Sequence, residues 1–408
     1  MNRPSFVVLQ HFEKLLINQM NQVDTLNPKQ SGLLMKFLEA EKLVEKHQVD
    51  CWLVTTAAIR DPNSNILMSL RIHGRHFIII TPPEQTNYVL TGATERPMAE
   101  KHLKDVAEID GYRDNDEMEE KFLKILSNKQ NIALNYNDES LRGVHGLTYS
   151  DYLWLSKLLP NTNFHSAAKF IYELRSVKNE EEIKNHRAAA KATMAGLELI
   201  PDIVKPNMTE LEIAAELEYH LRREADGGMA FDTIVGSAEN SADPHHNTGN
   251  KKIQTGAPLL IDVGIRKGSS VSDLTWTYFV GKPSEEFLAV YQAVSEAKEV
   301  GIKALKAKIS CKNVACEVIE YFRKTGYDPD ELFTHGLGHP IGFECHDIGP
   351  GLSKNSPDDM VTLENAVITV EPGLYWKEKW GVRLEDNVVI RKTQAERLCS
   401  TPKEPLTI

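Results

Sequence analysis

Residues 259–278, LLIDVGIRKGSSVSDLTWTY, decide the fold of the C-terminal half of this chain. Two apolar runs flank the turn RKGSS, which is typical of a β-hairpin. A turn centred on Lys267 and Gly268 places Asp262 directly opposite Asp273, with Cβ atoms about 4.5–5.5 Å apart. Two carboxylates that close repel each other unless a cation lies between them. The hairpin therefore predicts a metal site, and two ordinary aspartates at a turn and a strand end are the alternative.

A second carboxylate pair lies in residues 369–387, TVEPGLYWKEKWGVRLEDN. Pro372 and Gly373 interrupt the strand just after Glu371, which leaves its side chain at a break in the ladder. Glu385 follows on the returning segment. A lone carboxylate among aliphatic residues is costly to bury without a partner. That partner is either a metal ion or Arg383, in a purely structural salt bridge.

Residues 334–347, THGLGHPIGFECHD, contribute His335, His339 and His346. A single histidine is more often structural than a ligand, but three of them beside glycine-rich turns favour a site. His245 and His246, in the segment SADPHHNTG, are expected on a loop, where surface histidines are common.

Together the three segments predict a centre for two divalent ions, which lie about 3.5–4 Å apart in such sites. An oxygen-rich set with one imidazole favours manganese, with cobalt, iron and zinc as alternatives. The proposed ligands are Asp262, Asp273, His339, Glu371 and Glu385.

Composition excludes several classes of protein. With 408 residues, the chain has room for two or three domains. Its net charge of −11 argues against nucleic-acid binding. Five cysteines without a CxxC pair predict no disulfide framework and favour a cytoplasmic location. No apolar run approaches the roughly 18 residues of a membrane span, and residues 1–20 are expected to form an amphipathic helix rather than a signal peptide.

Hydrophobic periodicity predicts two domains. Strands are expected at 50–56, 76–81, 86–92 and 131–136, and helices at 32–47, 98–107 and 116–127. Thr148 is expected to cap a further helix. Strands that alternate with helices indicate an α/β domain over 1–175.

The C-terminal part, 176–408, is expected to be an α+β domain with antiparallel strands. Asn179 begins a long helix with an acidic first turn, and Thr209 with Glu212 forms a capping box. A helix pair followed by a carboxylate hairpin is expected twice, in 180–280 and in 285–392.

The five proposed ligands, in this order and at this spacing, resemble those of the creatinase/prolidase/methionine-aminopeptidase superfamily, the pita-bread metallopeptidases, over residues 178–392. The layout of 1–175 resembles the non-catalytic domain of aminopeptidase P, prolidase and creatinase. The resemblance implies that Glu371 is a metal ligand that also transfers protons. It further implies that His245 lies on the substrate side, that His346 contacts substrate and the tetrahedral intermediate, and that His335 and Arg383 line the pocket.

Two positions depart from the family pattern. Trp276 stands where the family often has an arginine in DxTRT. Prolidases tend to carry an arginine shortly after the position of His346, to bind a dipeptide's carboxylate. Here Asp347 and the residues IGPG follow, and Asp347 is expected to repel that carboxylate. Cys345 is expected to be a small apolar filler.

The sequence therefore predicts a cytoplasmic, homodimeric Xaa-Pro aminopeptidase, with Glu371 as proton carrier and His346 as oxyanion stabiliser. Its partners would be proline-containing peptides or a small-molecule substrate, with neither nucleic acid nor membrane. Arg60 or Arg71 could supply a further charge for substrate. An Xaa-Pro dipeptidase, and a metal-dependent lyase or hydrolase of small metabolites, are the alternatives. A binding module of the same fold is disfavoured because the ligands are intact.

Overall fold

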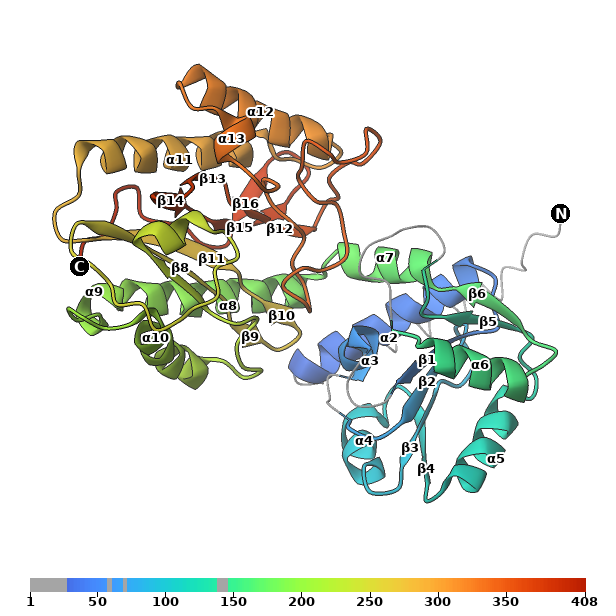
Figure 1. Cartoon of the computed structure of the whole chain (residues 1–408). Coiled ribbons are helices and arrows are strands. Elements are labelled where there is room, and N and C mark those ends of the chain that lie inside the picture. Colours follow the sequence, from blue (N-terminus) through green and yellow to red (C-terminus); the bar gives the residue numbers. More distant parts are fainter. Residues whose placement is uncertain (1–27, 57–60, 69–71, 138–145) are drawn as a thin grey trace. The chain divides into compact units, whose positions relative to one another are not determined.

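The computed structural model describes residues 28–56, 61–68, 72–137 and 146–408 (Figure 1). The chain divides into two compact units, Met1–Leu174 and Arg175–Ile408. The helix expected at residues 1–20, Arg60 and Arg71 all lie outside the described residues. Within the described ranges, no helix is long and apolar enough to cross a membrane.

The first unit is built on a mixed six-stranded sheet with the strand order β4-β3-β2-β1-β5-β6. Its strands are β1 (Cys51–Thr56), β2 (His76–Ile80), β3 (Tyr88–Gly92), β4 (Glu108–Tyr112), β5 (Asn131–Leu134) and β6 (Asn163–Ser166). Its helices are α2 (Pro28–Lys46), α3 (Pro62–Met68), α4 (Arg96–Leu103), α5 (Asn115–Leu126), α6 (Tyr149–Leu158) and α7 (Ala168–Ser176), which runs across the division between the units. Met118 and Phe122 of α5 and Leu155 of α6 pack on one face of the sheet. This is the predicted α/β arrangement.

The four predicted strands of this unit are present, and Thr148 caps α6 by accepting from the backbone N–H of Asp151. Four elements were not predicted: α3, β4, β6 and α7. In β6, the sequence NFHS has one large apolar residue and alternates between exposed and partly buried positions, so it carries little hydrophobic signal.

The second unit is α+β, as predicted, with mostly antiparallel strands. Its helices are α8 (Glu180–Glu198), α9 (Ile200–Ile203), α10 (Glu210–Glu224), α11 (Glu285–Ala304), α12 (Cys311–Lys324), α13 (Pro329–Leu332) and the 3-10 helix η1 (Ala238–Ala242). Its strands are β7 (Ile234–Ser237), β8 (Ala257–Val263), β9 (Arg266–Lys267), β10 (Ser270–Val271), β11 (Leu274–Val280), β12 (Val367–Val370), β13 (Gly373–Trp376), β14 (Trp380–Arg383), β15 (Asp386–Ile390) and β16 (Ala395–Arg397).

Two helix pairs cover two groups of strands in this unit (Figure 1). Helices α8 and α10 share a core with β7, β8 and β11, and α11 and α12 share a core with β12, β13, β14 and β15. Asn179 and Thr209 cap α8 and α10 in reciprocal capping boxes, which confirms both predicted starts. The predicted repeat of a helix pair and a carboxylate hairpin is therefore present.

The first carboxylate hairpin has a different register from the predicted one. Lys267 pairs with Ser270, and Asp262 pairs with Thr275 rather than with Asp273. The prediction of directly opposed aspartates is wrong, because the turn lies one residue later than expected. Side chains alternate between faces with a period of two, so this shift of two positions keeps both aspartates on one face.

The second carboxylate hairpin is broken where the sequence predicts. β12 ends at the residue before Glu371, and Glu385 lies in the matching break between β14 and β15. The backbone N–H of Glu385 donates to the carbonyl oxygen of Thr275 at 3.0 Å. This bond joins the second hairpin to the first and places the two carboxylate pairs side by side.

Candidate metal centre

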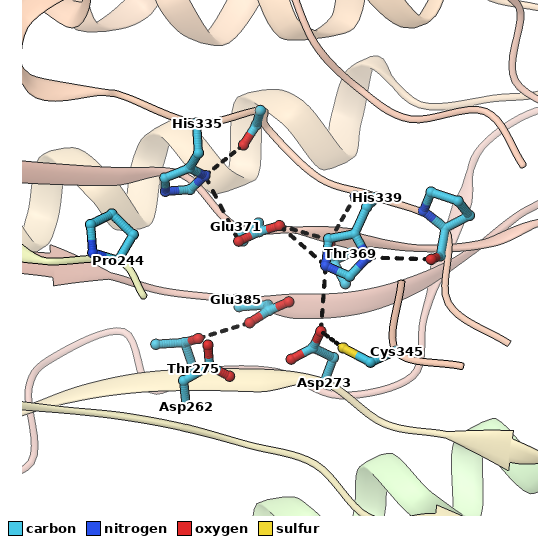
Figure 2. Close-up of polar contacts among 12 residues, drawn as sticks. Pro244, Asp262, Asp273, Thr275, His335, His339, Cys345, Thr369, Glu371 and Glu385 are labelled. Atoms are coloured by element: carbon cyan, nitrogen blue, oxygen red, sulfur yellow. Dashed lines mark hydrogen bonds and ion pairs between the residues drawn. The ribbon is translucent and has the colours of Figure 1, made fainter. Parts of the chain in front are cut away.

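The side chains predicted as metal ligands converge in the second unit (Figure 2). Asp262 lies near the end of β8, and Asp273 directly precedes β11. His339 lies in the loop after α13, and Glu371 and Glu385 come from the two strand breaks. Three segments far apart in the sequence thus bring four carboxylates and one imidazole together.

His339 lies between two of the carboxylates. Its Nε2 atom is 3.4 Å from Asp273 Oδ2 and 3.5 Å from Glu371 Oε1. One ligand atom each of Asp273, His339 and Glu385 lies within 4.8 Å of the other two. Atoms this close together are candidate ligands of a single ion, whose bonds to nitrogen and oxygen are about 2.0–2.2 Å long.

Gly338 sets the position of His339. A Cβ atom at Gly338 would lie 2.0 Å from the carbonyl oxygen of Thr369, so only glycine allows this close approach to β12. The backbone N–H of His339 donates to Thr369 Oγ1 at 2.9 Å, and this hydroxyl lies 3.3 Å from Glu371 Oε1. Thr369 therefore holds two of the proposed ligands in place.

Two carboxylate oxygens in this centre have no hydrogen-bond partner among the described residues. Asp262 Oδ1 and Glu385 Oε1 are both buried and unpaired. Their companion oxygens accept from Arg383 at 2.6 Å and from Thr275 at 2.8 Å. Because buried polar atoms are almost always paired, these two oxygens fit a cation. The donor set is rich in oxygen and has one imidazole, which also fits divalent ions.

Without a cation, the centre has an excess of negative charge. Burial raises the pKa of Asp262 to about 7; Arg383 offsets part of this, and the charge of Asp273 adds to it. Burial, followed by the charges of Asp273, Glu371 and Asp262, raises the pKa of Glu385 well above its usual range. The folded protein therefore binds protons where a metal ion would otherwise supply positive charge.

Asp273 and His339 behave as an ion pair. Burial would raise the pKa of Asp273, but the hydrogen bond and charge of His339 outweigh it and lower that pKa. Burial would lower the pKa of His339, but Asp273 and Glu371 raise it to about 9. The imidazole thus takes a proton in the absence of a cation.

Arg383 forms its ion pair with Asp262 at 2.6 Å, so the alternative in which it pairs with Glu371 is wrong. Its Nε donates to Thr275 Oγ1, and one Nη donates to the hydroxyl of Tyr375, both at 3.0 Å. The hydroxyl groups of Thr275 and Tyr375 thus hold the guanidinium in place against Asp262.

His335 and His346 lie on either side of His339 in the chain and both reach the centre. His335 Nε2 is 2.8 Å from the hydroxyl of Tyr375, and its Nδ1 is 3.9 Å from Glu371 Oε2. The ring centroids of His346 and His339 are 4.0 Å apart, and His346 is exposed.

The two histidines of the DPHH loop have different surroundings. The carbonyl oxygen of Pro244 accepts from Arg383 at 3.4 Å, which brings the loop to the centre. Figure 2 shows Pro244 beside the proposed ligands. His245, the next residue, is exposed. His246 Nε2 lies 2.8 Å from the buried carboxylate of Glu210. His246 therefore anchors the loop.

Trp276 points away from the centre. It follows Thr275 on β11, and its side chain packs in the core beneath α8 and α10. Because neighbouring side chains on a strand face opposite sides, this departure from the family pattern does not change the lining of the centre.

Comparisons with known proteins support one family. Residues 184–392, about half of the chain, match metallopeptidase family M24. The chain belongs to this family.

An Xaa-Pro dipeptidase of Pyrococcus horikoshii is 30% identical over 89% of this chain and 96% of that protein. A solved X-Pro aminopeptidase of Thermotoga maritima superposes with a TM-score of 0.80 at 29% identity, covering 90% of this chain and all of its own. An Xaa-Pro dipeptidase of Bacillus anthracis does so with a TM-score of 0.80 at 27% identity, covering 92% of this chain and all of its own.

This M24 protein is thus a metal-dependent peptidase, and its second unit has the pita-bread fold, as the resemblance implied. Three hydroxyl groups around the centre were not predicted from the sequence: those of Thr275, Thr369 and Tyr375. Thr275 and Thr369 each lie two residues from a proposed ligand, on the same face, so strand periodicity could have found them. The contacts of Tyr375 depend on how β13 and β14 pair, and no local pattern reports them.

The M24 peptidase secures the loop around His346 with a buried ion pair. Arg175 Nη2 is 2.5 Å from Asp347 Oδ1 and 2.7 Å from Glu344 Oε2. Asp347 also accepts two backbone N–H groups of the same loop, at 2.8 and 2.7 Å. The expectation that Asp347 repels a substrate carboxylate is wrong, because its side chain is only 2% exposed and is neutralised by Arg175.

Replacing Arg175 with methionine should lower the free energy of unfolding by about 3–5 kcal/mol, because Asp347 would stay buried without the guanidinium that neutralises it. Arg187→Met is the matched control. It removes an arginine from an ion pair with Glu396 whose side chains are 47% and 35% exposed, so it should cost no more than about 1 kcal/mol. Urea unfolding followed by circular dichroism measures both free energies. Equal losses of stability in the two variants would contradict a stabilising role for the Arg175–Asp347 ion pair.

Cys345 is not an apolar filler. Its Sγ donates to Asp273 Oδ2 at 3.0 Å. Burial, followed by the charge of Asp273, raises the pKa of this thiol. Cys345 is therefore a protonated donor to a proposed metal ligand when no cation is bound.

Proposed function

We propose that this M24 peptidase is an Xaa-Pro aminopeptidase, which removes the N-terminal residue that precedes proline. The supporting observation concerns a dipeptide's free carboxylate, because the described stretch that follows His346 carries no cation of its own to bind it. Residues 347–352, DIGPGL, contain neither arginine nor lysine. Arg175, which contacts this stretch, is paired with Asp347, and Arg383 at the metal centre is paired with Asp262. A dipeptide site needs a cation that grips the free carboxylate, whereas a longer peptide has no charge there.

The metal centre would hold two divalent ions, with manganese as the first choice and cobalt, iron or zinc as alternatives. The unpaired oxygens of Asp262 and Glu385 support this proposal. Such ions supply polarisation of the scissile carbonyl and acidification of a water molecule. The ligands would be Asp262, Asp273, His339, Glu371 and Glu385.

The remaining steps belong to side chains of this chain. Glu371 accepts a proton from the attacking water and passes it to the leaving proline nitrogen, as a general base and then a general acid. His346, exposed next to His339, donates to the oxyanion. Arg383 keeps Asp262 in place through its 2.6 Å ion pair. His335 and His245 position the substrate.

Substrate length tests the proposal. With manganese bound, Xaa-Pro-Yaa peptides should be cleaved with a kcat/KM at least about tenfold above that of Xaa-Pro dipeptides, a difference of about 1.4 kcal/mol in transition-state binding. Kinetics that favour dipeptides would make the protein an Xaa-Pro dipeptidase, the activity named for the Pyrococcus horikoshii relative. Hydrolysis of neither substrate would direct the search to small metabolites.

A cytoplasmic location and a homodimer stay predictions. Support for the location comes from the five cysteines, all of which are free thiols, as in a reducing compartment. Size-exclusion chromatography with light scattering tests the dimer.

A further inference from the structure

A second group of ligand atoms overlaps the oxygen-rich centre. His339, Cys345 and His346 each place one ligand atom within 4.8 Å of the other two. The group shares His339 with the set formed by Asp273, His339 and Glu385. It differs in chemistry, because it offers one sulfur and two imidazole nitrogens in place of carboxylates. We propose that these three residues form an inhibitory site for a thiophilic divalent ion such as zinc.

The donor types support this choice of ion. Cysteine sulfur and histidine nitrogen are the preferred ligands of zinc, whereas carboxylate oxygens suit manganese. The ion replaces the proton of the Cys345 thiol, and that proton passes to solvent. Asp273 Oδ2 lies 3.0 Å from the sulfur and adds a negative charge beside the ion. His346 is exposed, which gives the ion a path from solvent.

Occupation of this site should inhibit hydrolysis for two reasons. His339 would be drawn from the manganese set, and His346 would no longer be available to the oxyanion. This inhibitory consequence rests on the proposed function, whereas ion binding to the three side chains does not. Zinc would therefore oppose manganese at the same centre.

Binding is tested by absorption, independently of activity. Cobalt(II) added to the metal-free full-length protein should produce a thiolate-to-cobalt charge-transfer band in the near ultraviolet. The band should disappear in Cys345→Ser, which keeps a hydroxyl group beside Asp273 but removes the soft ligand. Cys316→Ser is the matched control, because Cys316 is the exposed cysteine on α12, and it should keep the band. No band in the wild-type protein, or a band that survives Cys345→Ser, would overturn the site.

Inhibition is tested on the manganese-loaded protein, with each variant compared with its own uninhibited rate. The zinc concentration for half inhibition should rise at least about tenfold in Cys345→Ser. Replacing a residue that only hydrogen-bonds to a metal ligand already costs about 10- to 100-fold in metal affinity, and Cys345 would be a ligand itself. It should be unchanged in Cys316→Ser. Equal inhibition of all three proteins would overturn the inhibitory role. Absence of manganese-dependent hydrolysis would instead refute the proposed function, and the cobalt spectra would still decide the site.

Discussion

A Glu385→Gln variant should lose more than about 10²-fold in kcat/KM. Glu385 belongs to the ligand group of Asp273 and His339. Replacing a residue that only hydrogen-bonds to a metal ligand already lowers metal affinity or activity about 10- to 100-fold, so replacing a ligand should cost more. Elemental analysis after reconstitution with manganese should show fewer bound ions than in the wild type. A variant that kept both its metal and its activity would remove Glu385 from the ligand set.

The same substitution should not lower the melting temperature of the metal-free protein, and should raise it by a few degrees. The Glu385 side chain is buried, and its Oε1 has no hydrogen-bond partner, so the neutral amide removes repulsion from nearby carboxylates. In a domain of this size, 1 kcal/mol corresponds to about 2–4 °C. Glu364→Gln, at an exposed position, is the control and should leave the melting temperature unchanged.

The pH dependence of the metal-free protein follows from the same charges. The pKa of Asp262 rises from its ordinary value of 3.8 to about 7 on folding, so the folded state binds a proton more tightly than the unfolded chain. The stability from this group is complete below pH 3.8 and is lost as the pH rises through about 7. The raised pKa values of Glu385 and His339 act in the same direction.

The melting temperature of the metal-free wild type should therefore fall as the pH rises from about 5 to about 8. Saturating manganese should remove most of this fall, and Glu385→Gln should reduce it. Differential scanning fluorimetry across that range measures all three. A melting temperature that rises with pH in the metal-free protein would contradict the carboxylate repulsion.

A His346→Ala variant should lose about 10²–10³-fold in kcat with its metal content retained, because one donor to an oxyanion contributes that much. His346 lies beside His339 but outside the oxygen-rich ligand group, so the expected loss concerns the transition state and not the ions. His165→Ala, an exposed histidine of the first unit, is the control and should keep full activity. Loss of metal from His346→Ala would instead make this histidine a ligand of the manganese centre.

The sequence by itself determined the two-part architecture and which residues gather at the centre. The carboxylates lie next to predicted strand ends, and glycine-rich turns surround His339. These are local features, so the pattern of apolar and polar residues within each segment is enough to predict them. The register of the first hairpin was not determined, because RKGSS can turn at two neighbouring positions. The error changed the partner of Asp262 from Asp273 to Thr275. It did not change the face, since a shift of two positions preserves side-chain direction.

Only the tertiary structure decided which charged and polar groups pair with one another. Arg383 reaches Asp262 across 121 residues of sequence, and Cys345 reaches Asp273 across 72. The sequence predicted a free negative charge at Asp347. In the structure this side chain is buried, Arg175 neutralises it, and two backbone N–H groups donate to it. Such contacts join segments that are far apart in the sequence, and their sequence separation does not predict how close they lie in space. They depend on how the hairpins and the His346 loop pack, and sequence spacing describes only residues within one element.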